Sequence, residues 1–448
     1  MSRCLVCSVA VCSAIFVAAS AVTLRADGPT LVPTQALPIR FARIPAEPVP
    51  LPPVDGASHA EIMTLAEAEA LALASHPAMR EVGGQVRAAR GEWLQVGLRP
   101  NPEIGYLGDE IGNNGRAGFQ GGFVSQEFVT AGKLGLSRAV ALRGVSAAEQ
   151  RLERTRLQVI TTVRTYYYET LVAERALAFA NQLEQIGGQA LQASELRLKA
   201  LEGTQAAVLQ SQVESDSANL LVMQATNRRD AARRRLASVT GVSEINPPPL
   251  EDSFNAQLPT LDWETVRSRL IAENPELAEL RFNVDQAKWA VQRAVAGRVP
   301  NLTVMSGAQY DNSSEFAVAN VLVSLPVPIF DRNQGGIAQA SGALTAAQAA
   351  LDSRELALAQ QLAAAMSEYI TAGRRVAKYS ESILPAAKQS LDLVIQAYQQ
   401  GELEYLEILA TQRTYTEKNL AYLADLDIAW KKWAEIDGLL VGPLPDSN

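Results

Sequence analysis

Few residues in this 448-residue chain have the side chains and spacing that catalysis or metal binding requires. Its only histidines are His59 and His76, and its only cysteines are Cys4, Cys7 and Cys12. One histidine lies in a proline-rich stretch and the other directly precedes a proline, so they do not form the cluster that a transition metal needs. No nucleophile with a neighbouring base and no phosphate-binding loop occurs in a suitable context. The sequence therefore predicts a protein that is not an enzyme and that carries no metal or cofactor of its own.

The charge of the chain argues against a nucleic-acid partner. The formal net charge is -8 and the pI is about 5.2, whereas a protein that binds nucleic acid usually presents a basic surface. One basic run is predicted to be a solvated helix face paired with neighbouring acids, namely Arg228, Arg229, Arg233, Arg234 and Arg235. The run Tyr166-Tyr167-Tyr168 is predicted to pack between helices rather than to stack on a ligand.

The N-terminal segment predicts export from the cytoplasm. A mostly apolar run at residues 4–22 ends in small side chains, so we interpret residues 1–21 as a signal peptide. An uncleaved transmembrane anchor is the alternative. Lipidation of Cys12 is disfavoured by the bulky Val11 before it. Residues 22–60 form a proline-rich leader whose composition cannot bury a core.

The rest of the chain is predicted to be a duplicated unit. His76-Pro77 and Asn274-Pro275 lie 198 residues apart, and Gly203 and Gly401 are separated by the same interval. A duplication explains this matched spacing better than chance does. We therefore expect a first repeat at residues 61–240, a linker at 241–261, a second repeat at 262–440 and a tail at 441–448.

Each repeat is expected to contain one β-hairpin followed by a long helix. Apolar residues alternate at 301–326, as paired strands require, and the first hairpin, at 101–128, is glycine-rich and less regular. Pro326 and Pro328 cannot donate to a sheet, so they must end the second hairpin. The predicted fold class is mainly α with a small β part.

The helical stretches that follow the hairpins are unusually long. Residues 134–202 and 334–400 keep the seven-residue apolar spacing of a coiled coil, and at about 1.5 Å per residue each would be about 100 Å long. Bends are expected at Gly187-Gly188 and at Pro385. A return helix is predicted after each of the two glycine turns.

Four strands cannot close a membrane barrel, since the smallest barrels need about eight and an open edge in lipid leaves peptide groups unpaired. Either the strands lie outside a membrane, or several copies of the chain complete the barrel. Three copies would supply a twelve-stranded barrel and a cylinder of helices.

The duplicated layout and four short motifs together resemble the TolC family of outer-membrane efflux proteins, in its CzcC-like heavy-metal efflux branch. The motifs are Arg99-Pro100-Asn101-Pro102, Ser125-Gln126-Glu127 before Gly132-Lys133, the run from Pro326 through Asp331-Arg332-Asn333 to Gly335, and Tyr398-Gln399-Gln400-Gly401. The resemblance covers the chain from about Thr64 to Leu440.

This resemblance implies a homotrimeric exit duct with no chemistry of its own. The barrel would sit in outer-membrane lipid and the helices would cross the periplasm. The helical ends would meet a periplasmic adaptor coupled to an inner-membrane, proton-driven pump of the RND type. The implied cargo is divalent heavy-metal cations. A multidrug or general small-molecule duct is an alternative, and a structural coiled-coil envelope protein is an alternative of another class.

The resemblance also implies roles for residues at the two glycine turns. The adaptor would dock on Arg197, Leu198 and Gly203 in the first repeat, and on Gly401, Glu402 and Leu403 in the second. Glu407 falls where the family often carries a ring of carboxylates that closes the periplasmic end, and Glu404 lies on the same helical face. Ala410 stands where a second family acid would fall. A solvated acidic face and simple helix-ending glycines are the alternatives.

Overall fold

The computed structural model describes residues 63–112, 115, 117–201, 203–241, 250, 258–311, 315–400, 402–403 and 405–440. The predicted signal peptide, proline-rich leader and tail lie outside the described residues, as does most of the predicted linker. His59 and the three cysteines are therefore also outside them.

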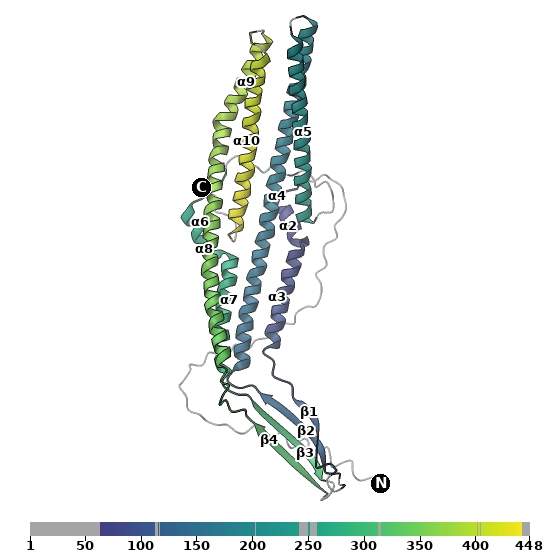
Figure 1. The fold of residues 1–448 in the computed structure, drawn as a ribbon, viewed down its shortest axis with the longest axis vertical. Coiled ribbons are helices and arrows are strands. Elements are labelled where there is room, and N and C mark those ends of the chain that lie inside the picture. The colour runs from purple at the N-terminus through teal and green to yellow at the C-terminus, as the bar shows by residue number, and fades with distance from the viewer. Residues whose placement is uncertain are drawn as a thin grey trace. The chain divides into compact units, whose positions relative to one another are not determined.

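The described chain repeats one succession of helices and strands (Figure 1). The first half contains α2 (Leu65–Ser75), α3 (Pro77–Gln95), β1 (Glu103–Asp109), β2 (Phe119–Phe128), α4 (Lys133–Lys199) and α5 (Gln205–Thr240). The second contains α6 (Trp263–Glu273), α7 (Pro275–Ala296), β3 (Leu302–Asp311), β4 (Phe316–Ser324), α8 (Gln334–Lys378), the π-helix η3 (Tyr379–Ile383), α9 (Leu384–Gln399) and α10 (Tyr405–Gly438). The predicted fold class, mainly helical with four strands, is confirmed.

Local capping explains where the short helices begin. Thr64 and Glu67 form a reciprocal capping box at the start of α2. His76 caps α3 because its Nδ1 accepts a hydrogen bond from the backbone N–H of Ala78 at 3.2 Å, and Asn274 caps α7 in the same way. His76 therefore has a structural role at a helix start.

The side-by-side order of the strands in the sheet matches the side-by-side order of the helices to which they are connected. The four strands form one antiparallel sheet in the order β1-β2-β3-β4. Helix α3 contacts α4, α4 contacts α7, and α7 contacts α8, as Figure 1 shows. Each strand is thus joined directly to the helix that occupies the same position in the helical layer.

The tyrosine run lies in the main hydrophobic core. Tyr167 is fully buried, and its hydroxyl donates to the carbonyl of Met63 at 3.1 Å. Tyr168 stacks on Trp430 with ring centroids 4.5 Å apart, and Trp433 packs against both rings. Burial raises the pKa of Tyr168 to about 12, so its phenol stays neutral at physiological pH. The prediction that this run packs between helices is confirmed.

The long helices differ from each other near the predicted bends. Helix α4 continues without interruption through Gly187-Gly188. A Cβ on Gly187 would lie 3.3 Å from the Cα of Ser215, so this glycine allows α5 to approach α4 closely. In the second half, η3 separates α8 from α9 just before Pro385, whose missing N–H cannot complete a regular turn.

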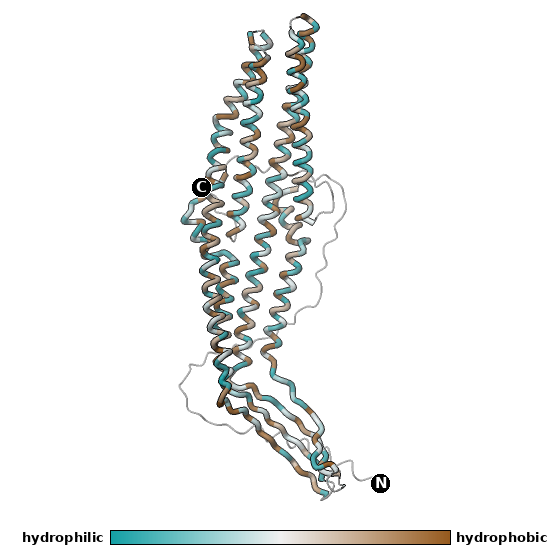
Figure 2. Tube along the Cα trace, viewed as in Figure 1, coloured by the Kyte–Doolittle hydropathy of each residue, from teal (hydrophilic) through white to brown (hydrophobic). Residues whose placement is uncertain are grey.

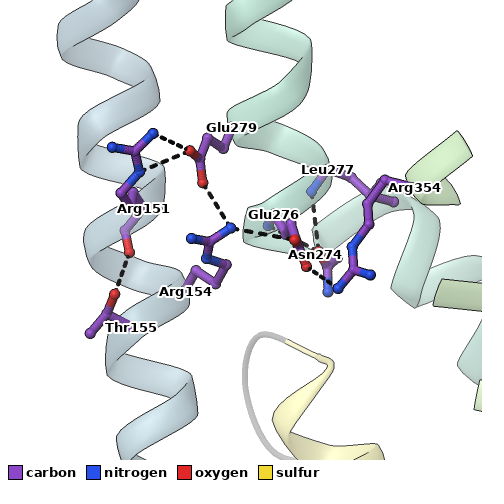
Figure 3. A network of polar contacts seen from close by, with 8 residues as sticks. All are labelled: Arg151, Arg154, Thr155, Asn274, Glu276, Leu277, Glu279 and Arg354. Atoms are coloured by element: carbon purple, nitrogen blue, oxygen red, sulfur yellow. Dashed lines mark hydrogen bonds and ion pairs between the residues drawn. The ribbon is translucent and has the colours of Figure 1, made fainter. Parts of the chain in front are cut away.

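Ion pairs between helices hold the layers together (Figure 3). The guanidinium of Arg151 donates to the buried carboxylate of Glu279 at 2.7 and 2.9 Å, and Arg154 lies 3.3 Å from the same carboxylate. Glu276 accepts from Arg354 of α8 at 2.7 Å. This network joins α4, α7 and α8.

The basic run on α5 is also paired with acids, as predicted. Arg233 and Arg235 bind Glu174 and Glu169 of α4, each at 2.6 Å.

Among the described residues, no helix is both long and apolar enough to cross a membrane. Figure 2 shows hydrophilic residues recurring along the long helices.

Candidate functional site

The strand register separates the sheet into two chemically different faces. Glu103 pairs with Ser125, Ser125 with Met305, and Met305 with Leu322. Because side chains alternate along a strand, residues in such a row share one face of the sheet and their chain neighbours share the other.

One of these faces, which we call the carboxylate face, carries all the charged residues of the four strands. Its acids are Glu103, Asp109, Glu127 and Asp311. None of the four strands contains lysine or arginine. Gln309 lies buried on this face, where it donates to Asp109 at 2.9 Å and accepts from Asn320. A surface of this composition attracts cations and repels anions.

The opposite face, which we call the apolar face, is mostly hydrophobic and exposed. Its residues include Ile104, Tyr106, Val124, Val321 and Val323, all of them exposed in the single chain. Alternation of an apolar outer side with a polar inner side is typical of strands that contact lipid on one face.

Asn301 joins the sheet to the helices. Its amide donates to Glu127 at the end of β2 at 2.6 Å, and its carbonyl oxygen accepts from the Lys133 ammonium at 2.5 Å. The hydroxyl of Thr130 donates to the carbonyl of Pro300 at 2.6 Å. Burial, together with the nearby Arg293 charge, lowers the pKa of Lys133. Pro300 and Asn301 thus fix the start of α4 against the sheet.

The turn between α4 and α5 contains three of the predicted docking residues. Arg197 and Leu198 lie half-buried in the last turn of α4. The left-handed residue of this turn is Leu201, with φ of 62° and 93% of its surface exposed. Gly203 is needed for another reason, because a Cβ there would lie 3.1 Å from the backbone nitrogen of Leu198.

The turn between α9 and α10 is described only in part. Gly401 and Glu404 lie outside the described residues. The backbone N–H of Glu402 donates to the carbonyl of Ala397 at 3.0 Å, and Leu403 is half-buried. Glu407 is exposed in the first turn of α10. Ile408 and Leu409, which follow it, are buried against Ala190 of α4, so the first turn of α10 is packed against the first hairpin.

The described residues include no group of three or more His, Cys, Asp or Glu side chains that could hold a metal ion. The carboxylates of the sheet are spread along the strands. They form a charged surface and do not converge on a coordination site.

A family model confirms the class of protein that this fold indicates. The model described as outer membrane efflux protein matches residues 70–242 and 266–437. The chain belongs to this TolC-like family. It is therefore an outer-membrane efflux channel with a periplasmic helical part, and it is not an enzyme, as the sequence predicted.

Individual relatives give useful points of comparison. The chain is 24% identical over 378 residues to the cobalt-zinc-cadmium resistance protein CzcC of Cupriavidus metallidurans, a match that covers 84% of this chain and 90% of the relative. It is 26% identical over 310 residues to the nickel-cobalt-cadmium resistance protein NccC of Alcaligenes xylosoxydans xylosoxydans, with 63% and 65% covered.

Among solved structures, the chain resembles CusC with a TM-score of 0.70 and 18% identity, over 84% of this chain and 92% of that one. CusC itself forms a transmembrane channel. At this level of identity the likeness shows the shared fold.

Two features of the site were not found from the sequence. The carboxylate face was missed, although Glu103 and Asp109 lie an even number of residues apart and so had to share a face if β1 was a strand. The exposed Leu201 was missed because glycine is the residue expected at such a turn.

Proposed function

We propose that this channel is the exit duct for divalent heavy-metal cations in a tripartite efflux system. The observation that carries the proposal is the carboxylate face, where every charge on the four strands is negative. Similarity over 84% of this chain to a cobalt-zinc-cadmium resistance protein supports the same cargo. The duct would conduct cations passively, with no resident metal site in its described part.

The proposed working form is a homotrimer. Four strands from each of three copies would make a twelve-stranded barrel, with the apolar face in outer-membrane lipid and the carboxylate face lining the lumen. The helices of the three copies would form the wall of the periplasmic tunnel. A periplasmic adaptor and an inner-membrane pump of the RND type would deliver the cargo.

The two helical turns are the proposed contact with the adaptor. Arg197, Leu198 and Gly203 in the first turn, and Gly401, Glu402 and Leu403 in the second, are the proposed docking residues. The fully exposed Leu201 adds an apolar side chain to the first of these surfaces.

The proposed periplasmic gate lies beside the second turn. Glu407 is exposed at the start of α10, and three copies around an axis would place like charges close together. Glu404, three residues earlier in the sequence, is proposed as its companion. Such a ring would favour cations and would make the closed end sensitive to pH and to divalent ions.

The test is the growth of a strain lacking this gene. We expect lower tolerance to zinc, cobalt, cadmium, copper or nickel than in the parent strain, and unchanged tolerance to dyes and hydrophobic antibiotics. A plasmid copy of the gene should restore growth. Sensitivity to drugs alone would keep the duct and overturn the metal cargo in favour of a multidrug or general channel. The other alternative, a structural envelope protein, does not agree with membership of an efflux family.

A further inference from the structure

The sheet and the helical layer each have two outer edges. Within the described residues, β1 pairs with β2 alone and β4 pairs with β3 alone. In the helical layer, α3 and α8 occupy the two outer positions, because α3 contacts α4 and α8 contacts α7. A ring of copies must therefore bring α8 and β4 of one copy beside α3 and β1 of the next.

An exposed apolar segment follows β4. Leu325, Val327, Ile329 and Phe330 are all exposed, and Phe330 reaches 89%. These residues continue beyond the last paired residue of the strand, Ser324. Two prolines interrupt this segment, so it cannot extend the sheet. Four exposed apolar side chains in so short a segment form a contiguous patch of the kind that marks a contact surface.

A second apolar patch precedes β1. Leu94 and Leu98 lie at the C-terminal end of α3 and just after it, and both are more than half exposed. The backbone here is held in place, because Arg138 of α4 lies over the ring of Trp93 at 4.5 Å and Gln126 donates to the carbonyl of Pro100 at 3.0 Å. The patch is thus an exposed surface at the C-terminal end of α3, next to anchored residues.

The two patches lie at the same end of the sheet. The strands alternate in direction, so β4 ends at the level where β1 begins, and the register places Glu103 and Leu322 in one row. Their flanking charges are opposite, with Arg99 next to Leu98 and Asp331 next to Phe330. Within the described part of the chain, Arg99 makes no hydrogen bond or ion pair, whereas Asp331 accepts a hydrogen bond from the backbone N–H of Asn333 at 2.8 Å.

We propose that the segment after β4, from Leu325 to Asp331, docks on the α3–β1 junction of a second copy of this chain, with Phe330 covered by Leu94 and Leu98 and with Asp331 paired to Arg99. The contact lies at the boundary between barrel and helical tunnel. It joins each copy to the next where the strands of the sheet give way to the helices. This inference rests on the homotrimer of the proposed function and names the residues that close it.

Cysteine cross-linking in native membranes tests the contact. All natural cysteines lie in the predicted signal peptide, so the processed chain offers no competing thiol. The double variant Leu98→Cys with Phe330→Cys should form dimers and trimers on a denaturing gel after treatment with a short bis-maleimide. The matched control, Leu209→Cys with Phe330→Cys, uses a leucine of similar exposure on α5 and should stay monomeric.

Charge reversal gives a second readout in the full chain. Arg99→Asp and Asp331→Arg should each reduce the fraction of trimer that survives mild detergent by at least about threefold, and the double swap should restore it. Because the single change at Asp331 also removes the hydrogen bond to Asn333, recovery in the double swap is the decisive comparison.

Three other outcomes are possible, and each would overturn a different part of the proposal. A trimer that forms normally but gives no cross-link between positions 98 and 330 would overturn the contact and leave the duct intact. Quenching of a Phe330→Trp variant by brominated lipids would show that the segment faces the membrane instead. A wild-type chain that is monomeric in membranes would overturn the proposed homotrimer itself.

Discussion

The guanidinium of Arg197, at the end of α4, lies over the ring of Tyr398, near the end of α9, with 4.9 Å between its Cζ and the ring centroid. This cation–π contact joins the turn of the first helical hairpin to the turn of the second. Arg197, predicted from the family resemblance to face the adaptor, thus also contacts a residue of its own chain. The two hairpin ends can separate only if this contact breaks.

We predict that Arg197→Ala loosens the periplasmic end of the duct. This half-buried cation–π contact should contribute at least about 0.5–1 kcal/mol, so the open probability should rise at least about two- to fivefold. Single-channel recording in planar bilayers measures this. Arg197→Lys should stay near wild type because the cation remains, and Arg267→Ala, at an exposed site on α6, should have no effect. An unchanged open probability in Arg197→Ala would show that the contact does not hold the ends together.

The two adjacent glycines of α4 provide a matched pair of substitutions. Gly187→Val should destabilise the protein by about 1–3 kcal/mol, because its side chain would press on the backbone of Ser215. Gly188→Val should change stability by less than about 0.5 kcal/mol, since nothing lies within 4 Å of its Cβ position. Thermal unfolding in detergent, followed by circular dichroism, compares the two. Equal melting temperatures would contradict the close approach of α5.

The buried carboxylate of Glu279 is predicted to stabilise the contact between α4 and α7. Glu279→Ala leaves Arg151 and Arg154 without their common acceptor and should cost about 3 kcal/mol, at the low end for buried pairs because Arg151 is 43% exposed. Glu149→Ala, which breaks the exposed pair with Arg90, should cost less than about 1 kcal/mol. A comparable loss of melting temperature in both variants would show that burial of Glu279 does not matter.

Neutralising the carboxylate face should reduce ion selectivity. In the combined variant Glu103→Gln, Asp109→Asn and Asp311→Asn, the trimer would lose nine negative charges from its proposed lumen, three from each copy. The cation-to-anion permeability ratio, measured from the reversal potential in a salt gradient, should then fall towards one. Glu149→Gln, on the helical surface, is the control and should keep the wild-type ratio. A channel that is already unselective as wild type would remove the electrostatic argument for a cation cargo.

The sequence predicted the positions of the strands, most clearly in the second hairpin, whose period-two pattern is more regular than that of the glycine-rich first one. Residues 119–128, with phenylalanine at both ends, coincide with β2, and the alternation that begins at Leu302 marks the start of β3. The first long helix was also predicted nearly to its ends. These features depend on local spacing, which a single sequence displays directly.

Features that depend on tertiary contacts could not be predicted in the same way. The two sites of expected bends differ in detail: a π-helix precedes Pro385, which lacks an N–H, whereas α4 continues unbroken through Gly187, where α5 approaches closely. Leu201 adopts a left-handed backbone that its side chain disfavours, so its type gave no sign of the turn. Predicting the carboxylate face requires knowledge of the register between strands, and this register is determined by contacts across the sheet. The roles assigned to Glu407 and to the docking residues stay predictions.

The central claim is that this duct releases divalent metal cations from the cell, and the most direct measurement follows the metal itself. Cells with and without the gene are loaded with zinc or cobalt, and metal released into fresh medium is quantified by mass spectrometry. We predict that release slows at least about threefold without the gene and recovers when it is restored. Equal metal release from both strains, together with slower release of a fluorescent dye from the mutant, would contradict the claim.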